Sequence, residues 1–205
     1  MDGKKNSMKK NVMRKTAVAL LALGCAACRG EDIQDMKKTD VSEPVKILVA
    51  CFSHTGNTRE VVRQIQAATG GDLFEIVPAA PYPTAYQAVV DQAKREIQSG
   101  TRPALRTNLA SVAEYDVVFV GSPNWWSTIA PPVATFLASH DWSGKTIVPF
   151  MTHEGTRMGH SVGDIRKLCP GATIRDGLPI RGGQVRRAQK EVEDWVNEIQ
   201  KEIMR

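Results

Sequence analysis

The chain has 205 residues, of which 42% are hydrophobic and 24% charged, and its formal net charge is +5. These values suit one globular domain with a single core and leave little room for two. The charge does not indicate a nucleic-acid or lipid surface, because six cations lie before residue 16 and the 21 basic and 21 acidic side chains beyond residue 24 balance.

Residues 1–28 have the pattern of a secretory signal, in which basic residues precede an apolar run, residues 16–28, that ends in small side chains. The run is shorter than the roughly 20 apolar residues that a membrane-spanning helix needs. It is similar to the lipobox of bacterial lipoproteins, which implies lipidation of Cys25 or, as the second choice, Cys28. Cleavage without lipidation is a third possibility. We expect an exported protein, periplasmic or held at a membrane only by a lipid anchor; if the signal is not used, the protein is cytoplasmic.

The chain has four cysteines, two in the signal segment and two in the expected domain. Cys25 and Cys28 are spaced as C-x-x-C, but they end a signal segment, so a thioredoxin-like redox pair is not favoured. For Cys51 and Cys169 we expect two buried free thiols. A disulfide between them is the alternative in an oxidising compartment.

Residues 29–44 are polar, have no periodicity and end in a proline, which is typical of a linker. The folded domain is therefore expected at residues 45–205. Short, continuously apolar runs predict strands that are buried on both faces. These runs are residues 45–52, 72–77, 116–121, 146–151 and, more weakly, 172–180. Amphipathic stretches predict helices near residues 61–68, 84–99, 131–139, 160–169 and 185–203.

This alternation of strands and helices predicts an α/β fold with a doubly wound, five-stranded parallel sheet. In such folds ligands bind at the carboxyl ends of the strands.

The first of these ends runs into residues 53–58, which read SHTGNT, and then into a helix. At such a junction the backbone N–H groups and the helix dipole converge on an anion. The three hydroxyl side chains add donors, the glycine lets the backbone approach closely, and Asn57 can donate an amide or cap the helix. We predict that this segment, the phosphate loop, binds a phosphate group. A hydroxyl-rich helix cap without a ligand is the alternative.

Other phosphate-binding motifs do not fit the sequence. The chain has neither G-x-x-x-x-G-K-[ST] nor G-x-G-x-x-G, which excludes a P-loop and a dinucleotide motif. A cysteine phosphatase loop on Cys51 would need an arginine where Asn57 stands. A receiver domain would need acidic residues at the strand ends, and VACFS and VFVGS have none.

SHTGNT matches the [ST]-x-T-G-x-T loop of flavodoxins, and the chain from Val45 to about Ile203 resembles the flavodoxin-like family. THEG, followed by G-H-S-V-x-D-I and G-L-P-I-R-G, is similar to a bacterial branch of that family that is often exported. The resemblance implies a strand order of 2-1-3-4-5 and FMN at the carboxyl edge of the sheet. The expected phosphate contacts are Ser53, His54, Thr55, Gly56, Asn57 and Thr58, with His54 contributing its backbone.

The same resemblance assigns two later loops to the flavin ring. The third strand runs into GSPNWWSTIAPP, whose candidate contacts are Ser122, Pro123, Asn124, Trp125 and Trp126. One tryptophan is expected to fill the top of the core and the other to lie against the flavin. After the fourth strand, the candidates on the other side of the ring are Thr152, His153, Glu154 and Gly155.

His153, Glu154 and His160 also raise the question of a metal site. H-E-x-x-H is absent, because Arg157 stands where its second histidine would be, and a single loop offers poor metal-binding geometry. No metal site is predicted.

Three functions remain, in this order. The first is an FMN electron carrier that serves a redox partner protein. The second is an FMN-dependent NAD(P)H:quinone-type oxidoreductase with a small acceptor such as a quinone, and the third is an FMN-free binding scaffold. Since GSPNWWSTIAPP has no acidic residue, an extremely reducing flavin is not expected. No nicotinamide motif separates the first two functions.

Overall fold

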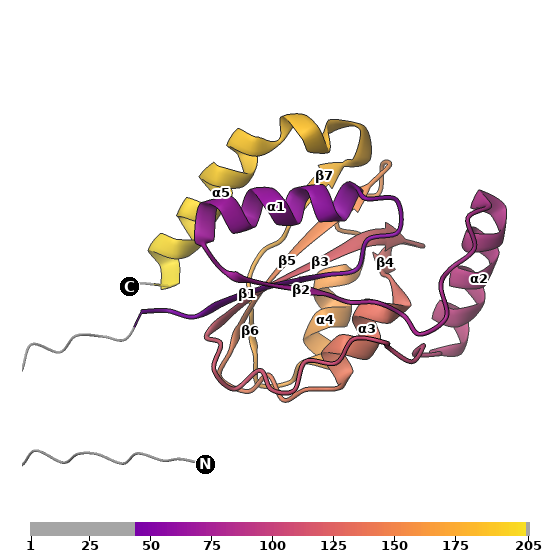
Figure 1. Cartoon of the computed structure of the whole chain (residues 1–205), viewed down its shortest axis with the longest axis horizontal. Coiled ribbons are helices and arrows are strands. Elements are labelled where there is room, and N and C mark those ends of the chain that lie inside the picture. Colours follow the sequence, from indigo (N-terminus) through magenta and orange to yellow (C-terminus); the bar gives the residue numbers. More distant parts are fainter. Residues whose placement is uncertain (1–43, 204–205) are drawn as a thin grey trace, which may run out of the picture. The chain divides into compact units, whose positions relative to one another are not determined.

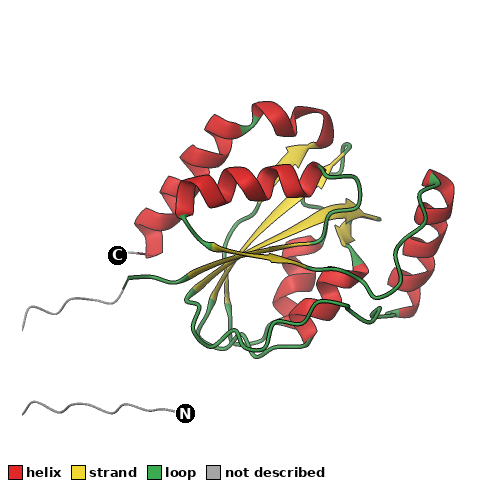
Figure 2. Cartoon of the chain, viewed as in Figure 1, coloured by secondary structure: helices red, strands yellow, loops and turns green. Residues whose placement is uncertain are grey.

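A parallel β-sheet with helices on both faces forms the body of the protein (Figures 1 and 2). The computed structural model describes residues 44–203. The export signal, Cys25, Cys28 and all but the last residue of the linker lie outside the described residues, and they stay predictions. No helix within residues 44–203 is long and apolar enough to cross a membrane.

The sheet has the strand order β2-β1-β3-β5-β6, and these strands are all parallel. They are β1 (Ile47–Cys51), β2 (Asp72–Glu75), β3 (Val117–Trp125), β5 (Thr146–His153) and β6 (Thr173–Ile174). A further strand, β7 (Leu178–Arg181), also pairs with β5 in parallel. If β6 and β7 are counted as one interrupted strand, the predicted α/β class and the order 2-1-3-4-5 are confirmed.

Side chains of β1 alternate between two hydrophobic cores, one on each face of the sheet. Leu48 and Ala50 lie in the core that α3 (Pro131–Ala138) and α4 (Ser161–Leu168) cover. Val49 and Cys51 lie in the core that α1 (Asn57–Thr69) and α5 (Gln189–Ile203) cover. This alternation follows from the two-residue period of a strand. The remaining helix, α2 (Tyr86–Ser99), buries only Val89 and Ala93.

The end of the third strand and the start of the last helix differ from the sequence predictions. The third strand runs on to Trp125 and turns back through Trp126 and Ser127 into β4 (Thr128–Ile129). Both turn residues have positive φ, 52° and 66°, the backbone geometry of a tight two-residue hairpin. Residues 182–187 form a 3₁₀ helix, η1 (Gly182–Arg187), so the last α-helix begins at Gln189 rather than at residue 185.

The two described cysteines are both buried free thiols, as predicted. Cys51 lies in the core on the α1 and α5 side, whereas Cys169 lies in the core on the α3 and α4 side. Burial raises the pKa of each thiol to about 12. The sheet between them excludes the alternative disulfide.

Gly121 is a buried position at which β3 has no room for a side chain. An added Cβ would lie 2.2 Å from the Phe150 ring and 2.9 Å from Cys51 Cβ. Gly121→Ala is therefore expected to lower the free energy of unfolding by about 1–3 kcal/mol. Urea unfolding followed by circular dichroism measures this change.

Gly163→Ala is the matched control, because a Cβ there meets open space within α4. It should raise the free energy of unfolding by about 0.5–1 kcal/mol. If Gly121→Ala left the midpoint unchanged, the tight packing of β3 against β5 would be refuted.

Candidate functional site

The predicted site residues lie at the carboxyl ends of β1, β3 and β5, which are neighbours at the same edge of the sheet (Figure 1). The phosphate loop joins β1 to α1, and the two segments predicted to contact the ring, here called the ring loops, begin within the last residues of β3 and β5 and run on beyond them. Parallel pairing brings these segments together although almost a hundred residues separate the first from the last.

The phosphate loop leaves hydrogen-bond donors at the start of α1 without a partner. Gly56 is the N-cap residue, with φ of 97°, and it provides no side-chain cap. Among the described residues, no group accepts a hydrogen bond from the backbone N–H of Asn57 or Thr58. Free N–H groups at the positive end of a helix dipole favour an anion.

Hydroxyl groups supply further donors at the same place. Thr58 and Thr152 are buried, and their Oγ1 atoms are 2.8 Å apart. One hydrogen bond uses only one of the two protons, so the pair keeps one proton for another acceptor. Ser53 Oγ accepts a hydrogen bond from the backbone N–H of Arg59 at 3.2 Å and likewise keeps its own proton. Thr55 is exposed on the loop.

An aromatic cluster stands beside the phosphate loop. The Trp125 ring centroid lies 4.9 Å from that of Tyr82, 5.4 Å from that of Phe52 and 6.0 Å from that of His54. All three contacts are edge-to-face, an arrangement that aromatic pairs favour. Tyr82 donates its hydroxyl proton to Glu96 of α2. Burial, helped by that carboxylate, raises the pKa of Tyr82, so the phenol stays protonated.

The two tryptophans have different surroundings. Trp125 is half-buried and packs against the core, which is the role expected of one of them. Trp126 is 49% exposed, donates its indole N–H to the Val90 carbonyl of α2 at 3.1 Å, and has Lys94 over its ring. Trp126 also lines a groove between α2 and α4. Of the two indoles, the one that borders the phosphate loop is therefore Trp125.

Ser122 and Pro123 have structural roles at the end of β3. Ser122 is fully buried, and its hydroxyl accepts the Ala130 N–H and donates to the Pro123 carbonyl, both at 2.8 Å. Pro123 pairs with Thr152 in the β3–β5 ladder and has no N–H to offer. Neither side chain has a hydrogen-bond donor left for a ligand.

The two ring loops are joined to each other. Asn124 donates its side-chain amide to the Arg157 carbonyl at 2.8 Å, and the His160 N–H donates to the Ser127 carbonyl at 2.6 Å. At Gly159 an added Cβ would lie 2.2 Å from that same Ser127 oxygen, which explains the glycine. The hairpin after β3 and the loop after β5 therefore form one continuous wall.

Two buried polar atoms in this wall lack a hydrogen-bond partner, namely Asn124 Oδ1 and His153 Nδ1. Leaving a buried polar atom unpaired costs about 1–3 kcal/mol. Such atoms at the carboxyl ends of neighbouring strands suit a ligand that completes their hydrogen bonds. Glu154 and Gly155, which come next, are exposed.

His153 carries the main electrostatic signal of the site. Burial, and then the positive charge of Arg157, lower its pKa from the ordinary 6.5, with a smaller effect of Arg181 in the same direction and an opposing effect of Glu154. Arg181 is the β7 partner of His153 in the parallel pairing with β5. The imidazole is therefore neutral at physiological pH.

Four neighbours of the site were not found from the sequence. Tyr82 comes from the segment after β2, and Arg157 lies beyond the predicted part of its loop. Arg181 ends β7 and Gly182 begins η1, where a Cβ on Gly182 would lie 2.3 Å from Glu154 Oε1 and 2.7 Å from Asn57 Nδ2. Their common signal is position, since each lies at or beyond the carboxyl end of a strand.

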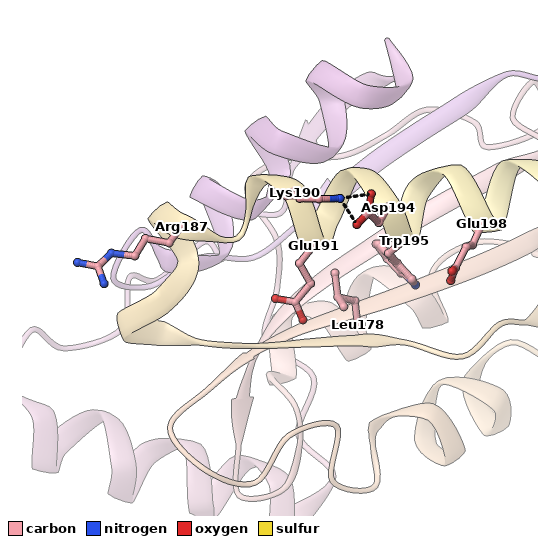
Figure 3. Close-up of a pocket in the computed structure, with 7 residues that line it drawn as sticks. All are labelled: Leu178, Arg187, Lys190, Glu191, Asp194, Trp195 and Glu198. Atoms are coloured by element: carbon pink, nitrogen blue, oxygen red, sulfur yellow. Dashed lines mark hydrogen bonds and ion pairs between the residues drawn. The ribbon is translucent and has the colours of Figure 1, made fainter.

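One groove lies apart from these loops. A groove of about 590 Å³ runs along α5, with Leu178 and Trp195 in its wall and a Lys190–Asp194 ion pair of 2.7 Å at its rim (Figure 3). It contains none of the predicted site residues.

Within residues 44–203, His, Cys, Asp and Glu side chains form no group of three that could hold a metal ion.

The lowered pKa of His153 makes a prediction for solution. Because the folded-state pKa lies below the unfolded value of 6.5, the neutral form is favoured in the folded protein, and stability is lost as pH falls below 6.5. An NMR titration of the His153 ring should give a pKa below 6.5. Arg157→Gln should raise it, whereas Arg166→Gln in the last turn of α4 should not. A His153 pKa at or above 6.5 would contradict this electrostatic environment.

Solved structures share this architecture. A candidate flavoprotein from Bacteroides uniformis is 31% identical, with 75% of this chain and 98% of that chain covered and a TM-score of 0.67. A second, from Bacteroides eggerthii, is 33% identical, covers 73% and 98% of the two chains and has a TM-score of 0.62. A flavoprotein from Lactobacillus acidophilus, solved in complex with FMN, shares the fold at 23% identity, 70% and 98% coverage and a TM-score of 0.56.

None of the curated proteins matches the chain. The sequence profile described as flavodoxin matches residues 46–199, from the start of β1 to the last turns of α5. The match includes the phosphate loop and both ring loops, and it agrees with the strand order of the sheet. This chain therefore belongs to the flavodoxin family.

Proposed function

We propose that the protein binds FMN at the carboxyl edge of its sheet and acts in electron transfer with a redox partner. The observation that carries this proposal is two sets of polar groups that lack hydrogen-bond partners at the same edge of the sheet. Donors without a partner cluster at the start of α1, and two unpartnered buried atoms lie at the carboxyl ends of β3 and β5. A flavin nucleotide has a phosphate for the first set and a polar ring edge for the second.

The phosphate end is the better defined of the two. The N–H groups at the start of α1 and the hydroxyls of Ser53, Thr55 and Thr58 would hold it. Because Thr58 is fixed by Thr152, its hydroxyl is oriented by β5 before a ligand arrives. Charge-assisted hydrogen bonds of this kind are about twice as strong as neutral ones.

The ring end lies between the two ring loops and the aromatic cluster. Asn124 and His153 offer the unpartnered polar atoms, and Trp125 offers a half-buried aromatic surface. When bound, FMN supplies a group that can pass one or two electrons. The chain's own side chains orient it and limit the access of water. The Lactobacillus acidophilus flavoprotein, which has the same fold, was solved in complex with FMN.

The cellular setting is also a proposal. The N-terminal pattern supports export, with lipidation of Cys25 or Cys28 as the anchor. The partner would then be a redox protein or a small acceptor, such as a quinone, in or near the membrane that holds the lipid anchor.

Removing hydroxyl donors from the phosphate loop should weaken FMN binding. Thr55→Ala combined with Thr58→Ala is expected to raise the Kd for FMN about 100-fold, because two hydrogen bonds to a charged group are lost. Quenching of FMN fluorescence during a protein titration measures the Kd. The far-ultraviolet circular dichroism spectrum should keep its helical signal.

The matched control is Thr55→Ala combined with Thr58→Ser. It restores the hydroxyl opposite Thr152 and should recover a large part of the affinity. Unchanged FMN affinity in the double alanine variant would remove the phosphate loop from the site.

NAD(P)H distinguishes a carrier from a reductase. If the protein is a carrier, anaerobic NADH or NADPH alone will not bleach the flavin absorbance at a catalytically competent rate, whereas dithionite will. Rapid bleaching by either nucleotide would instead establish the reductase. A protein that shows no flavin absorption bands after purification with FMN would refute both and leave the scaffold.

A further inference from the structure

The two unpartnered atoms of the ring loops have complementary hydrogen-bond properties. Asn124 Oδ1 is a hydrogen-bond acceptor, and the donation from its amide nitrogen to the Arg157 carbonyl fixes the orientation of the amide. His153 is only 9% exposed, and its Nδ1 is buried without a partner. A neutral imidazole can carry its proton on Nδ1 and donate it.

These atoms match one edge of the flavin ring. The pyrimidine edge of an isoalloxazine presents one N–H group between two carbonyl groups. Asn124 Oδ1 suits the N–H, and His153 Nδ1–H suits a neighbouring carbonyl oxygen. Asn124 and His153 directly follow the last residue pair of the β3–β5 ladder, Pro123 and Thr152, so the two strands place them next to each other.

Two arginine side chains lie near His153. Arg181 is next to His153 across the β5–β7 pairing, and Arg157 lies four residues further along the loop. Neither takes part in an ion pair within residues 44–203, although six other basic side chains do. Both act on His153 electrostatically, and Glu154 is the one carboxylate that acts on it.

We propose that Asn124 and His153 bind the pyrimidine edge of the flavin, and that Arg157 and Arg181 place positive charge beside it, so that this edge stabilises the reduced flavin. The inference rests on the proposed function. Reduction by two electrons from the redox partner, with uptake of one proton from solvent, leaves one net negative charge on the ring. The His153 N–H and the two arginines favour that charge, which raises the midpoint potential. No covalent bond to the protein forms or breaks.

Arginine substitutions test this inference through the potential of the bound flavin. Dithionite titration against a reference dye gives the midpoint potential of the FMN-loaded protein. Arg157→Gln and Arg181→Gln should each weaken binding of reduced relative to oxidised flavin about tenfold, which equals a fall of about 30 mV for a two-electron couple. Arg157→Lys and Arg181→Lys keep the charge and should stay near the original potential.

Arg166→Gln is the control for an arginine at the far end of α4, and it should leave the potential unchanged. His153→Gln, which keeps a donor, should bind FMN more tightly than His153→Ala. If flavin is bound but both glutamine variants keep the original potential, the inference is overturned while the proposed function stands. If no flavin absorption develops with FMN, the proposed function fails first.

Discussion

The backbone N–H groups at the start of α1 lack a hydrogen-bond acceptor among the described residues. The proposed binding site at the carboxyl edge of the sheet is built around these free donors. Gly56, with φ of 97°, turns the chain from β1 into the helix without a side-chain cap, so the N–H groups of Asn57 and Thr58 have no acceptor among the described residues. The Thr58–Thr152 hydrogen bond then links the same turn to β5. One buried hydrogen bond thus connects the proposed phosphate site at the start of α1 to the end of β5, which would hold the flavin ring.

The walls of the site are fixed by contacts that need no ligand. Tyr82, Phe52 and His54 hold Trp125 edge-on, while α2 holds Trp126 through the Val90 carbonyl. Two arginines and one glutamate act on His153, so the charge around it is positive, although beyond residue 24 the chain is electrically balanced. Local charge at the site is therefore independent of the overall composition, and it is the local charge that acts on a bound group.

The fold class could be predicted because it depends on local pattern, and the strand order could be predicted from the resemblance to flavodoxins. Continuous apolar runs mark buried parallel strands, and SHTGNT lies next to the first of them. The hairpin at Trp126 and Ser127 could not be predicted, since neither residue is one of the glycine or asparagine types that favour positive φ. Tyr82, Arg181 and Gly182 come from segments that are distant in the sequence and lie at or beyond the ends of β2 and β7, which pair with β1 and β5. Which tryptophan borders the phosphate loop is likewise decided by contacts with α2.

Comparing FMN with riboflavin tests the role of the phosphate loop most directly, because the two ligands differ only in the phosphate group. Titrating each flavin with the protein and following fluorescence quenching gives the two dissociation constants. If the loop binds the phosphate, riboflavin should bind at least about 100-fold more weakly than FMN. Equal affinities for the two flavins would contradict the assignment of SHTGNT as a phosphate-binding loop.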